Sequence, residues 1–348
     1  MIGGTSTGGL IAIMLGRLRM SLRDCEKAYL QLSERIFNPK RHSLHAFGKA
    51  KDFLMANGKF DSQALEDAIK EVVVSIAKMP EGELLQDPEP ECKVKAPDTL
   101  ADDSYDRCVS TTRVKNSQIA VLRSYENNLP ETLYDDCKIW EACRATSAAP
   151  TFFDPVKIGP YDQEFVDGGL LYNNPIQLVH REAVATWHNR VDGAVFISIG
   201  TGSAPSGAFE GNLKIIIEAM KEIVTQTERI STEFAESHPE LLLRNCFFRF
   251  QVFHGLETVG LEEYKEKAKI ADATQSYLDI WETKKKVEDC VEKVCATTWP
   301  VSPPRTTCFV VPFERDSKFI GRNDIITQIG RKFEAQRRVA LAGIGGVG

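Results

Sequence analysis

Hydrophobic positions near the N-terminus follow the spacing of a helix. The apolar residues from Leu10 to Leu18 recur every three to four positions, and two glycines, Gly8 and Gly9, stand directly before them. This spacing predicts a helix that opens at the glycine pair. Ser6 is then expected at the N-terminal turn of that helix.

Four longer patterns predict further helices. Residues 21–36 and 62–77 are amphipathic, and each begins at a serine, a residue type that caps helix N-termini. Residues 212–236 and 261–296 also show long helical patterns. We expect the first two helices to lie on the surface and to wrap the core.

Short apolar runs between these helices predict strands. Residues 108–114, 118–125 and 156–169 resemble strands bounded by turns, and residues 194–202 form a near-continuous apolar run that predicts a buried strand. Strands that alternate with helices predict the α/β fold class. Residues 80–106 are rich in Pro, Asp and Glu and lack periodicity, so we expect an exposed loop there.

Composition narrows the functional classes. The 348-residue chain is 43% hydrophobic, and its net charge of −6 with scattered Lys and Arg argues against nucleic-acid binding. No stretch of about 18 uninterrupted apolar residues is present, so no segment is expected to span a membrane. Nine cysteines without a CxxC pair predict neither a disulfide framework nor a zinc site, and they favour a reducing, cytoplasmic location.

A break in composition divides the chain near its C-terminus. The segment that follows the last predicted helix is rich in proline and has no period, which is typical of a linker. We therefore expect a main domain over 1–296, a linker over 297–315 and the beginning of a second domain over 316–348. In that last segment Gly343 and Gly348 have the G-x-x-x-x-G spacing of a phosphate-binding P-loop.

Residues 4–8 carry the first chemical motif. Gly4-Thr5-Ser6-Thr7-Gly8 matches G-x-S-x-G, in which glycines flank a serine because the strand-to-helix turn is too tight for side chains. The Ser6 hydroxyl is then an exposed nucleophile above the positive end of a helix dipole, and the Thr7 N–H is an oxyanion donor. The alternative is a glycine-rich turn in which Ser6 or Thr7 only caps the helix.

A serine nucleophile needs a base, and Asp167 is the candidate. It lies in the run from Phe165 to Gly169, at the C-terminal end of a predicted strand, where α/β proteins place their chemistry. The alternative is that Asp-Gly-Gly only forms a turn. A Ser-His-Asp triad with His180 or His254 as base stays open, although no signature singles out either histidine.

Four landmarks stand in an order that resembles the patatin-like phospholipases. They are Gly3-Gly4-Thr5-Ser6-Thr7-Gly8-Gly9, Ala145-Thr146-Ser147-Ala148-Ala149-Pro150-Thr151-Phe152-Phe153, Phe165-Val166-Asp167-Gly168-Gly169-Leu170 with Asn173-Asn174-Pro175, and Ser198-Ile199-Gly200-Thr201-Gly202. The resemblance implies a three-layer α/β/α fold with a mostly parallel central sheet. It also implies hydrolysis of lipid esters, of phospholipase A or galactolipase type, through a dyad of Ser6 and Asp167 without metal or cofactor.

The same resemblance implies supporting roles for neighbouring residues. Gly168, Gly169 and Asn174 are expected to position the segment around Asp167. The small residues of the second landmark suit a helix packed closely behind the site, where Ser147 is interpreted as structural. The implied partners are an acyl-lipid substrate and a membrane contacted peripherally, with no nucleic acid.

Both ends of the chain depart from the family pattern. Patatin-like enzymes carry a glycine-rich oxyanion loop before the nucleophile, but here the chain begins at Met1, five residues before Ser6. We therefore expect a fragment that lacks this loop and one or more N-terminal strands. The alternative function is a catalytically impaired module that binds lipid or signals.

At the other end, Phe319-Ile320-Gly321-Arg322 resembles the entry to an NB-ARC nucleotide-binding domain. Together with a patatin-like domain this resembles a fungal immune-type receptor with the hydrolase as effector. Nucleotide binding is expected only in a longer protein, because the P-loop lysine and hydroxyl residue are not in this sequence.

Overall fold

The computed structural model describes the chain in segments. The described residues are 1–36, 60–87, 107–113, 119–125, 135–150, 152–170, 173–187, 193–202, 226–256 and 265–296, together with Leu133, Val191 and Val259. They belong to one unit that runs from Met1 to Thr298. The predicted linker over 297–315 and the predicted nucleotide-binding segment over 316–348 lie outside the described residues, so these domain boundaries stay predictions.

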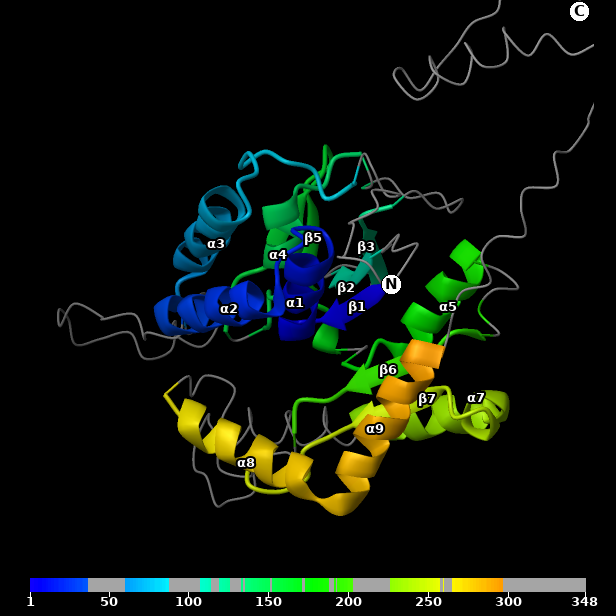
Figure 1. The fold of residues 1–348 in the computed structure, drawn as a ribbon. Helices are drawn as coiled ribbons and strands as arrows, with labels where there is room; N and C mark the ends of the chain where they lie inside the picture. The colour runs from blue at the N-terminus through cyan, green and yellow to red at the C-terminus, as the bar shows by residue number, and fades with distance from the viewer. Residues whose placement is uncertain are drawn as a thin grey trace, which may run out of the picture. The chain divides into compact units, whose positions relative to one another are not determined.

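Strands and helices are mixed along this unit, and the predicted α/β class is confirmed (Figure 1). In chain order the elements are β1 (Ile2–Thr5), α1 (Thr7–Gly16), α2 (Leu22–Ile36), α3 (Ser62–Glu71), the π-helix η2 (Val72–Ile76), β2 (Arg107–Arg113), β3 (Ile119–Arg123), α4 (Ile139–Thr146), β4 (Val156–Ile158), β5 (Gln163–Asp167), the 3-10 helix η3 (Gly168–Leu170), α5 (Ile176–Trp187), β6 (Phe196–Ile199), α7 (Pro239–Leu243), β7 (Phe247–Phe250), α8 (Lys267–Asp279) and α9 (Trp281–Ala296). The predicted helix over 212–236 is described only from 226 onward, where a helix covers 226–237.

The larger sheet has five strands, in the order β1, β2, β5 and β4, with β3 also paired to β2. β1 runs parallel to β2, whereas the pairs β2–β3, β2–β5 and β4–β5 are antiparallel. The prediction of a mostly parallel central sheet is therefore wrong for these described strands. The connections from β2 to β3 and from β4 to β5 are too short for the crossover that a parallel pair needs, so both pairs form hairpins.

A second, smaller sheet consists of β6 and β7, which pair in parallel. Its parallel arrangement is compatible with the long connection between the two strands. The three-layer arrangement of the whole domain stays a prediction.

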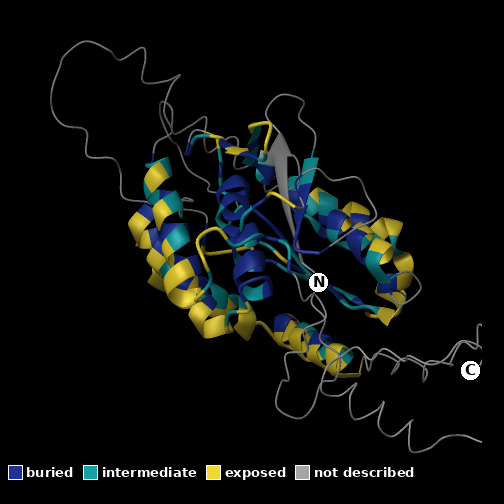
Figure 2. Ribbon diagram, turned by 90° about the horizontal axis from the view of Figure 1, so that it is seen from above, coloured by how far each residue is buried: buried dark blue, intermediate teal, exposed yellow. Residues whose placement is uncertain are grey.

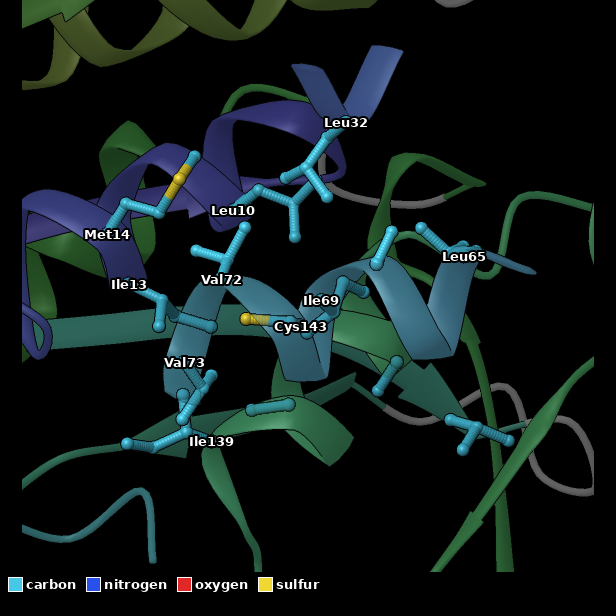
Figure 3. Packing of buried hydrophobic residues seen from close by; sticks show 14 of the residues in the cluster. Leu10, Ile13, Met14, Leu32, Leu65, Ile69, Val72, Val73, Ile139 and Cys143 are labelled. Atoms are coloured by element: carbon cyan, nitrogen blue, oxygen red, sulfur yellow. The ribbon is translucent and has the colours of Figure 1, made fainter. Parts of the chain in front are cut away.

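The largest buried cluster of the described residues gathers around α1, which is buried on nearly every side. The helix contains no charged residue, and a helix that is apolar all round is suited to the interior of a domain. Leu10, Ile13 and Met14 belong to one buried cluster with side chains from α2, α3 and α4 (Figure 3). The outer helices, in contrast, show exposed outward faces (Figure 2). The predicted helix at the glycine pair is confirmed and begins at Thr7.

The two predicted surface helices are present, but only one begins as expected. In α2, Ser21 Oγ accepts a hydrogen bond from the Asp24 N–H at 3.1 Å and so caps the helix. In α3 the prediction of a serine cap is wrong, because Asp61 accepts the N–H groups of the first turn. Ser62 Oγ instead donates to the Asp154 carboxylate at 3.0 Å.

The prediction of an exposed loop over 80–106 is wrong for residues 83–87, which are held against α1. The buried Arg17 side chain donates through Nε to the Leu85 carbonyl oxygen and through Nη2 to the Glu83 carboxylate, both at 2.9 Å. A buried guanidinium needs several acceptors, and this segment supplies them. The later part of the predicted loop lies outside the described residues.

Three other predicted elements differ in detail. Residues 156–169 contain two strands, β4 and β5, joined by a tight turn, and not one strand. In the strand predicted over 194–202, Ile197 and Ile199 are exposed, so β6 is buried on one face only. Residues 261–296 contain two helices, α8 and α9. None of the helices in the described part of the chain combines the length and the apolar character needed to cross a membrane.

Candidate active site

The backbone turns sharply between β1 and α1, and Ser6 is the residue at the turn. Its φ of 55° and ψ of −128° lie in a region that costs a residue with a side chain about 1–3 kcal/mol. The N–H groups of Gly9 and Leu10 donate to the Ser6 carbonyl oxygen at 2.9 and 3.2 Å. The Ser6 side chain makes no capping hydrogen bond to the helix. Ser6 therefore occupies the N-cap position of α1, but its side chain does not cap the helix, and its hydroxyl is available for another contact.

The glycines around Ser6 differ in what the fold demands of them. A Cβ at Gly4 would lie 2.0 Å from the Gly8 carbonyl oxygen, and a Cβ at Gly9 would lie 2.2 Å from Thr146 Oγ1. A Cβ at Gly8 would meet nothing within 4 Å, so the expectation that Gly8 is required for lack of room is wrong. The close approach at Gly9 was missed by sequence reasoning, because it depends on a helix far away along the chain.

The sheet brings Ser6 and Asp167 together because two strands meet end to end. β1 pairs with β2 as far as Thr5 opposite Ser110, and β5 pairs with β2 as far as Asp167 opposite Thr111. β3 covers the same stretch of β2, and since a strand has only two edges, β1 and β5 share the other one. They run toward each other along that edge. Asp167 therefore reaches Ser6 from an opposed strand and not from a parallel neighbour.

The Asp167 carboxylate is buried and held from two sides. The residue is 3% exposed, and its Oδ1 accepts a hydrogen bond from the Gly169 N–H at 2.7 Å. The Ser6 side chain lies close enough to the carboxylate to stabilise its ionised form. Burial raises the pKa of Asp167 to about 6, although Ser6 and the Gly169 N–H oppose the rise. The group is thus ionised at neutral pH yet more basic than an exposed aspartate.

This arrangement suits proton transfer from a hydroxyl to a carboxylate. Serine at its ordinary pKa is a weak nucleophile and needs an adjacent base, and the Asp167 carboxylate occupies that place. Helix α1 begins at Thr7, so the partial positive charge of its N-terminus lies beside Ser6. The Thr7 N–H belongs to the first turn, whose N–H groups have no acceptor within the helix. Its role as an oxyanion donor stays a prediction.

The C-terminal end of α4 and the residues that follow it contact the backbone of Ser6 and of Asp167, in agreement with the small side chains of the second landmark. Thr146 Oγ1 donates to the Ser6 carbonyl oxygen at 3.4 Å. The Asp167 N–H donates to the Ala148 carbonyl oxygen at 2.9 Å. Thr146 and Ala148 are both 0% exposed, and Ser147 lies between them. Sequence reasoning missed both contacts, because small residues signal close packing but not what is packed.

The residues expected to support Asp167 lie on the segment that follows it. Gly168 and Gly169 begin the 3-10 helix η3, and the Gly169 N–H holds the carboxylate. Asn174 is 3% exposed, and its Oδ1 accepts the N–H of the first α5 residue at 3.2 Å. Its Nδ2 donates to the Thr227 carbonyl oxygen at 3.3 Å. Asn174 therefore holds the start of α5 and does so from a buried position.

The contacts of His180 give no support to a histidine base. The ring centre of His180 lies 5.1 Å from Phe196, 5.5 Å from Phe234 and 4.3 Å from His238. Burial lowers the pKa of His180, and the neighbouring His238 lowers it further. His254 is exposed. Within the described segments, no group of three or more His, Cys, Asp or Glu side chains is placed to hold a metal ion.

Comparison with known proteins gives a family match over the part of the chain that contains Ser6 and Asp167. Residues 1–180, just over half of the chain, match the family model described as patatin-like phospholipase. Human calcium-independent phospholipase A2-gamma is 28% identical over 283 residues, which cover 76% of this chain and 32% of that protein. Phospholipase A I of Arabidopsis thaliana is 27% identical over 295 residues, 72% of this chain and 22% of that protein.

A third relative differs in its name and its coverage. The protein named probable inactive patatin-like protein 9, from Arabidopsis thaliana, is 23% identical over 327 residues, 87% of this chain and 77% of that protein. The chain spans less than a third of the length of the first two relatives. The family match runs from the turn at Ser6 through the Asp167 segment into α5, and by that match the chain belongs to the patatin-like phospholipase family.

Proposed function

We propose that the chain is a lipid acyl hydrolase that cleaves carboxylic esters through Ser6 and Asp167. The observation that carries this proposal is the meeting of β1 and β5 end to end, which brings Ser6, at a strained turn, beside the buried Asp167 carboxylate. Membership of the patatin-like phospholipase family supports a lipid ester as the substrate.

The first half of the reaction forms an acyl-enzyme. Asp167 takes the proton of the Ser6 hydroxyl while Ser6 Oγ attacks the ester carbonyl carbon. The negative charge that develops on the carbonyl oxygen faces the N-terminus of α1, where the Thr7 N–H is the candidate donor. The tetrahedral intermediate then expels the alcohol, which receives the proton held by Asp167.

The second half releases the acyl group. A water molecule gives a proton to Asp167 and attacks the acyl carbon, and the new intermediate expels Ser6 Oγ. Asp167 returns the proton to Ser6, which restores the starting state. The raised pKa of Asp167 favours this cycle because the same carboxyl must both accept and return a proton near neutral pH.

The proposed substrate class follows from the family and not from a described pocket. Relatives named phospholipase A2-gamma and phospholipase A I support a phospholipid as the substrate. We also propose cleavage of galactolipids and a peripheral contact with a membrane from the cytoplasm. The cycle above uses no metal or cofactor. We further propose that the hydrolase is the effector of a larger receptor, in which a nucleotide binds to a separate domain.

A fluorophosphonate probe tests the activated serine directly. We expect the wild-type chain to be labelled covalently, and Ser6→Ala to lose all labelling at the active site. Asp167→Asn should lower the rate of p-nitrophenyl ester hydrolysis by about two to four orders of magnitude, because the base is lost. Release of free fatty acid from phosphatidylcholine vesicles then identifies the lipid activity.

Ser33→Ala provides the matched control. Ser33 Oγ donates to the Tyr29 carbonyl oxygen within α2, so its replacement removes a serine hydroxyl far from the proposed chemistry along the chain. Labelling and hydrolysis should equal those of the wild type. Labelling that persists in Ser6→Ala would sink the assignment of the nucleophile.

A second candidate function is a patatin-like module without catalysis. Its support is the relative named probable inactive patatin-like protein 9, which aligns over most of both chains. In that case the folded wild-type chain would bind phospholipid vesicles without labelling or fatty-acid release. Sedimentation with vesicles, measured beside the labelling, separates the two functions.

A further inference from the structure

One short segment contacts the backbone on both sides of the proposed dyad. Thr146 Oγ1 donates to the Ser6 carbonyl oxygen at 3.4 Å, and two residues later the Ala148 carbonyl oxygen accepts the Asp167 N–H at 2.9 Å. We call residues 146–148 the bracket. The bracket spans the point at which β1 and β5 end, so it fixes two chain ends that no strand pairing joins directly.

Ser6 needs such support because its backbone is strained. At φ 55° a residue with a Cβ persists only when its surroundings hold it there. The Gly9 and Leu10 N–H groups that bond to the Ser6 carbonyl belong to α1 and turn with it. Within the described residues, Thr146 on α4 also donates to this carbonyl and does so from a separate element.

The bracket lies close against α1, because Gly9 and Thr146 meet where α1 and α4 pack together. A Cβ at Gly9 would lie 2.2 Å from Thr146 Oγ1 and 2.8 Å from Thr146 Cγ2, so glycine is what allows this approach. Thr146 is fully buried, and a hydroxyl in the interior is unfavourable unless it is hydrogen bonded. An apolar side chain would fill the same space, so the hydroxyl points to a role beyond packing.

We propose that Thr146 is a positioning residue that, with Ala148, sets the distance and angle between the Ser6 hydroxyl and the Asp167 carboxylate. The predicted effect of Thr146 on turnover rests on the proposed function. The predicted effect of Thr146 on the backbone at Ser6 is independent of that function. Thr146 does not contact the reacting atoms and acts through the Ser6 carbonyl.

Thr146→Val and Thr146→Ser form the central test. Valine keeps the shape and removes the hydroxyl, whereas serine keeps the hydroxyl and removes a methyl group. On a p-nitrophenyl ester we expect Thr146→Val to lower kcat about three- to tenfold, the size of one hydrogen bond, with KM unchanged. Thr146→Ser should retain kcat within about twofold. A valine variant with wild-type kcat, or a serine variant as slow as valine, would overturn the proposal.

A second pair of variants separates positioning from simple packing. Gly9→Ala should slow turnover more than Thr146→Val does, because its Cβ forces α1 and α4 apart. Adding Thr146→Ala removes Oγ1 and Cγ2, the two atoms closer than 3.0 Å, and leaves Cβ at 3.0 Å, but it does not restore the hydroxyl. Under the proposal the double variant folds normally and stays at or below the kcat of Thr146→Val. Full recovery of kcat in the double variant would show that only packing matters.

Hydrogen exchange provides a readout that needs no activity. In the full 348-residue chain, Thr146→Val should speed amide exchange at Gly9 and Leu10, which bond to the Ser6 carbonyl, by about tenfold if one supporting bond is lost. The α3 helix serves as the internal reference. Unchanged exchange at both amides would overturn the inference even if the wild-type chain hydrolysed no ester, and a change without wild-type activity would leave the bracket standing and the proposed function refuted.

Discussion

Asp167 and Glu182 are both buried carboxylates, 3% and 1% exposed, yet their pKa values are shifted in opposite directions. At Asp167 burial raises the pKa to about 6, and two neutral donors oppose the rise only in part. At Glu182 burial acts in the same direction, but the Arg123 guanidinium and the Tyr125 hydroxyl outweigh it and lower the pKa. Arg123 Nε and Nη2 contact the two Glu182 oxygens at 2.6 and 2.7 Å.

The opposite directions of the two pKa shifts indicate different roles for the two carboxylates. Glu182 carries a full counter-charge from β3, so it stays ionised and links that strand to α5. The groups that oppose the rise in the pKa of Asp167 are a hydroxyl and a backbone N–H. Neither carries a full charge, so the carboxylate can both accept and release a proton near neutral pH. The first arrangement holds the fold, and the second favours proton transfer.

The largest effect is expected from removing the counter-charge of Glu182. Arg123→Met leaves a buried carboxylate without its cation and should lower the free energy of unfolding by about 3–5 kcal/mol. Urea unfolding measures this change. Adding Glu182→Leu should recover much of the loss.

Arg229→Met is the matched control for that experiment. Arg229 pairs with Glu233 on the surface, and its side chain is 66% exposed, so no measurable change in stability is expected. Equal losses in the two arginine variants would contradict the contrast between buried and exposed charge.

Replacing Asp167 is expected to change the free energy of unfolding by a smaller amount and in the opposite direction. Between about pH 4 and pH 6 the folded state keeps a proton on Asp167 that the unfolded chain releases, so the contribution of this group to stability falls as pH rises through that window. Asp167→Asn should therefore be more stable than the wild type by up to about 3 kcal/mol above pH 7, with no gain near pH 4. A gain independent of pH would argue against a raised pKa.

The same titration should appear in the rate. If Asp167 is the base, kcat/KM for a p-nitrophenyl ester should fall about tenfold per pH unit below an apparent pKa near 6. Arg229→Met should leave this midpoint in place. A midpoint near 4 would show that the reacting carboxylate is not the buried one.

The smallest effect tests the hydroxyl at the ion pair. Tyr125 donates to Glu182 at 2.8 Å, and Tyr125→Phe should lower the free energy of unfolding by about 1 kcal/mol, well below the loss for Arg123→Met. Thermal unfolding of the two variants at one pH makes the comparison. A loss as large as that of the arginine variant would mean that the hydroxyl and not the cation neutralises Glu182.

Short motifs explain why much of the site was predictable. Ser6 and Asp167 each lie in a run of small residues whose order resembles one family, and the strand-turn-helix around Ser6 follows from local pattern alone. Local pattern cannot give strand direction, however. The opposed course of β5 depends on how it pairs with β2, which periodicity does not report.

Contacts between distant residues account for what was missed. Arg123 and Glu182 lie 59 positions apart, and a charge in a half-buried strand or an amphipathic helix ordinarily faces water. Thr146 and Ser6 are 140 positions apart, and a threonine within a helix carries no sign of the carbonyl it will meet. Such pairs become visible only once the packing of the elements is known.

The two glycines of the G-x-S-x-G motif differ in whether the fold leaves room for a side chain, because a Cβ at Gly8 would meet nothing within 4 Å. Gly4 is required by the polypeptide itself, whereas position 8 has room for a side chain. The Cβ of a cysteine at position 8 would therefore meet no obstacle within 4 Å. Position 8 is thus a site where a cysteine-linked fluorophore can be attached two residues from Ser6, so that the arrival of a lipid can be observed by quenching before any bond is broken.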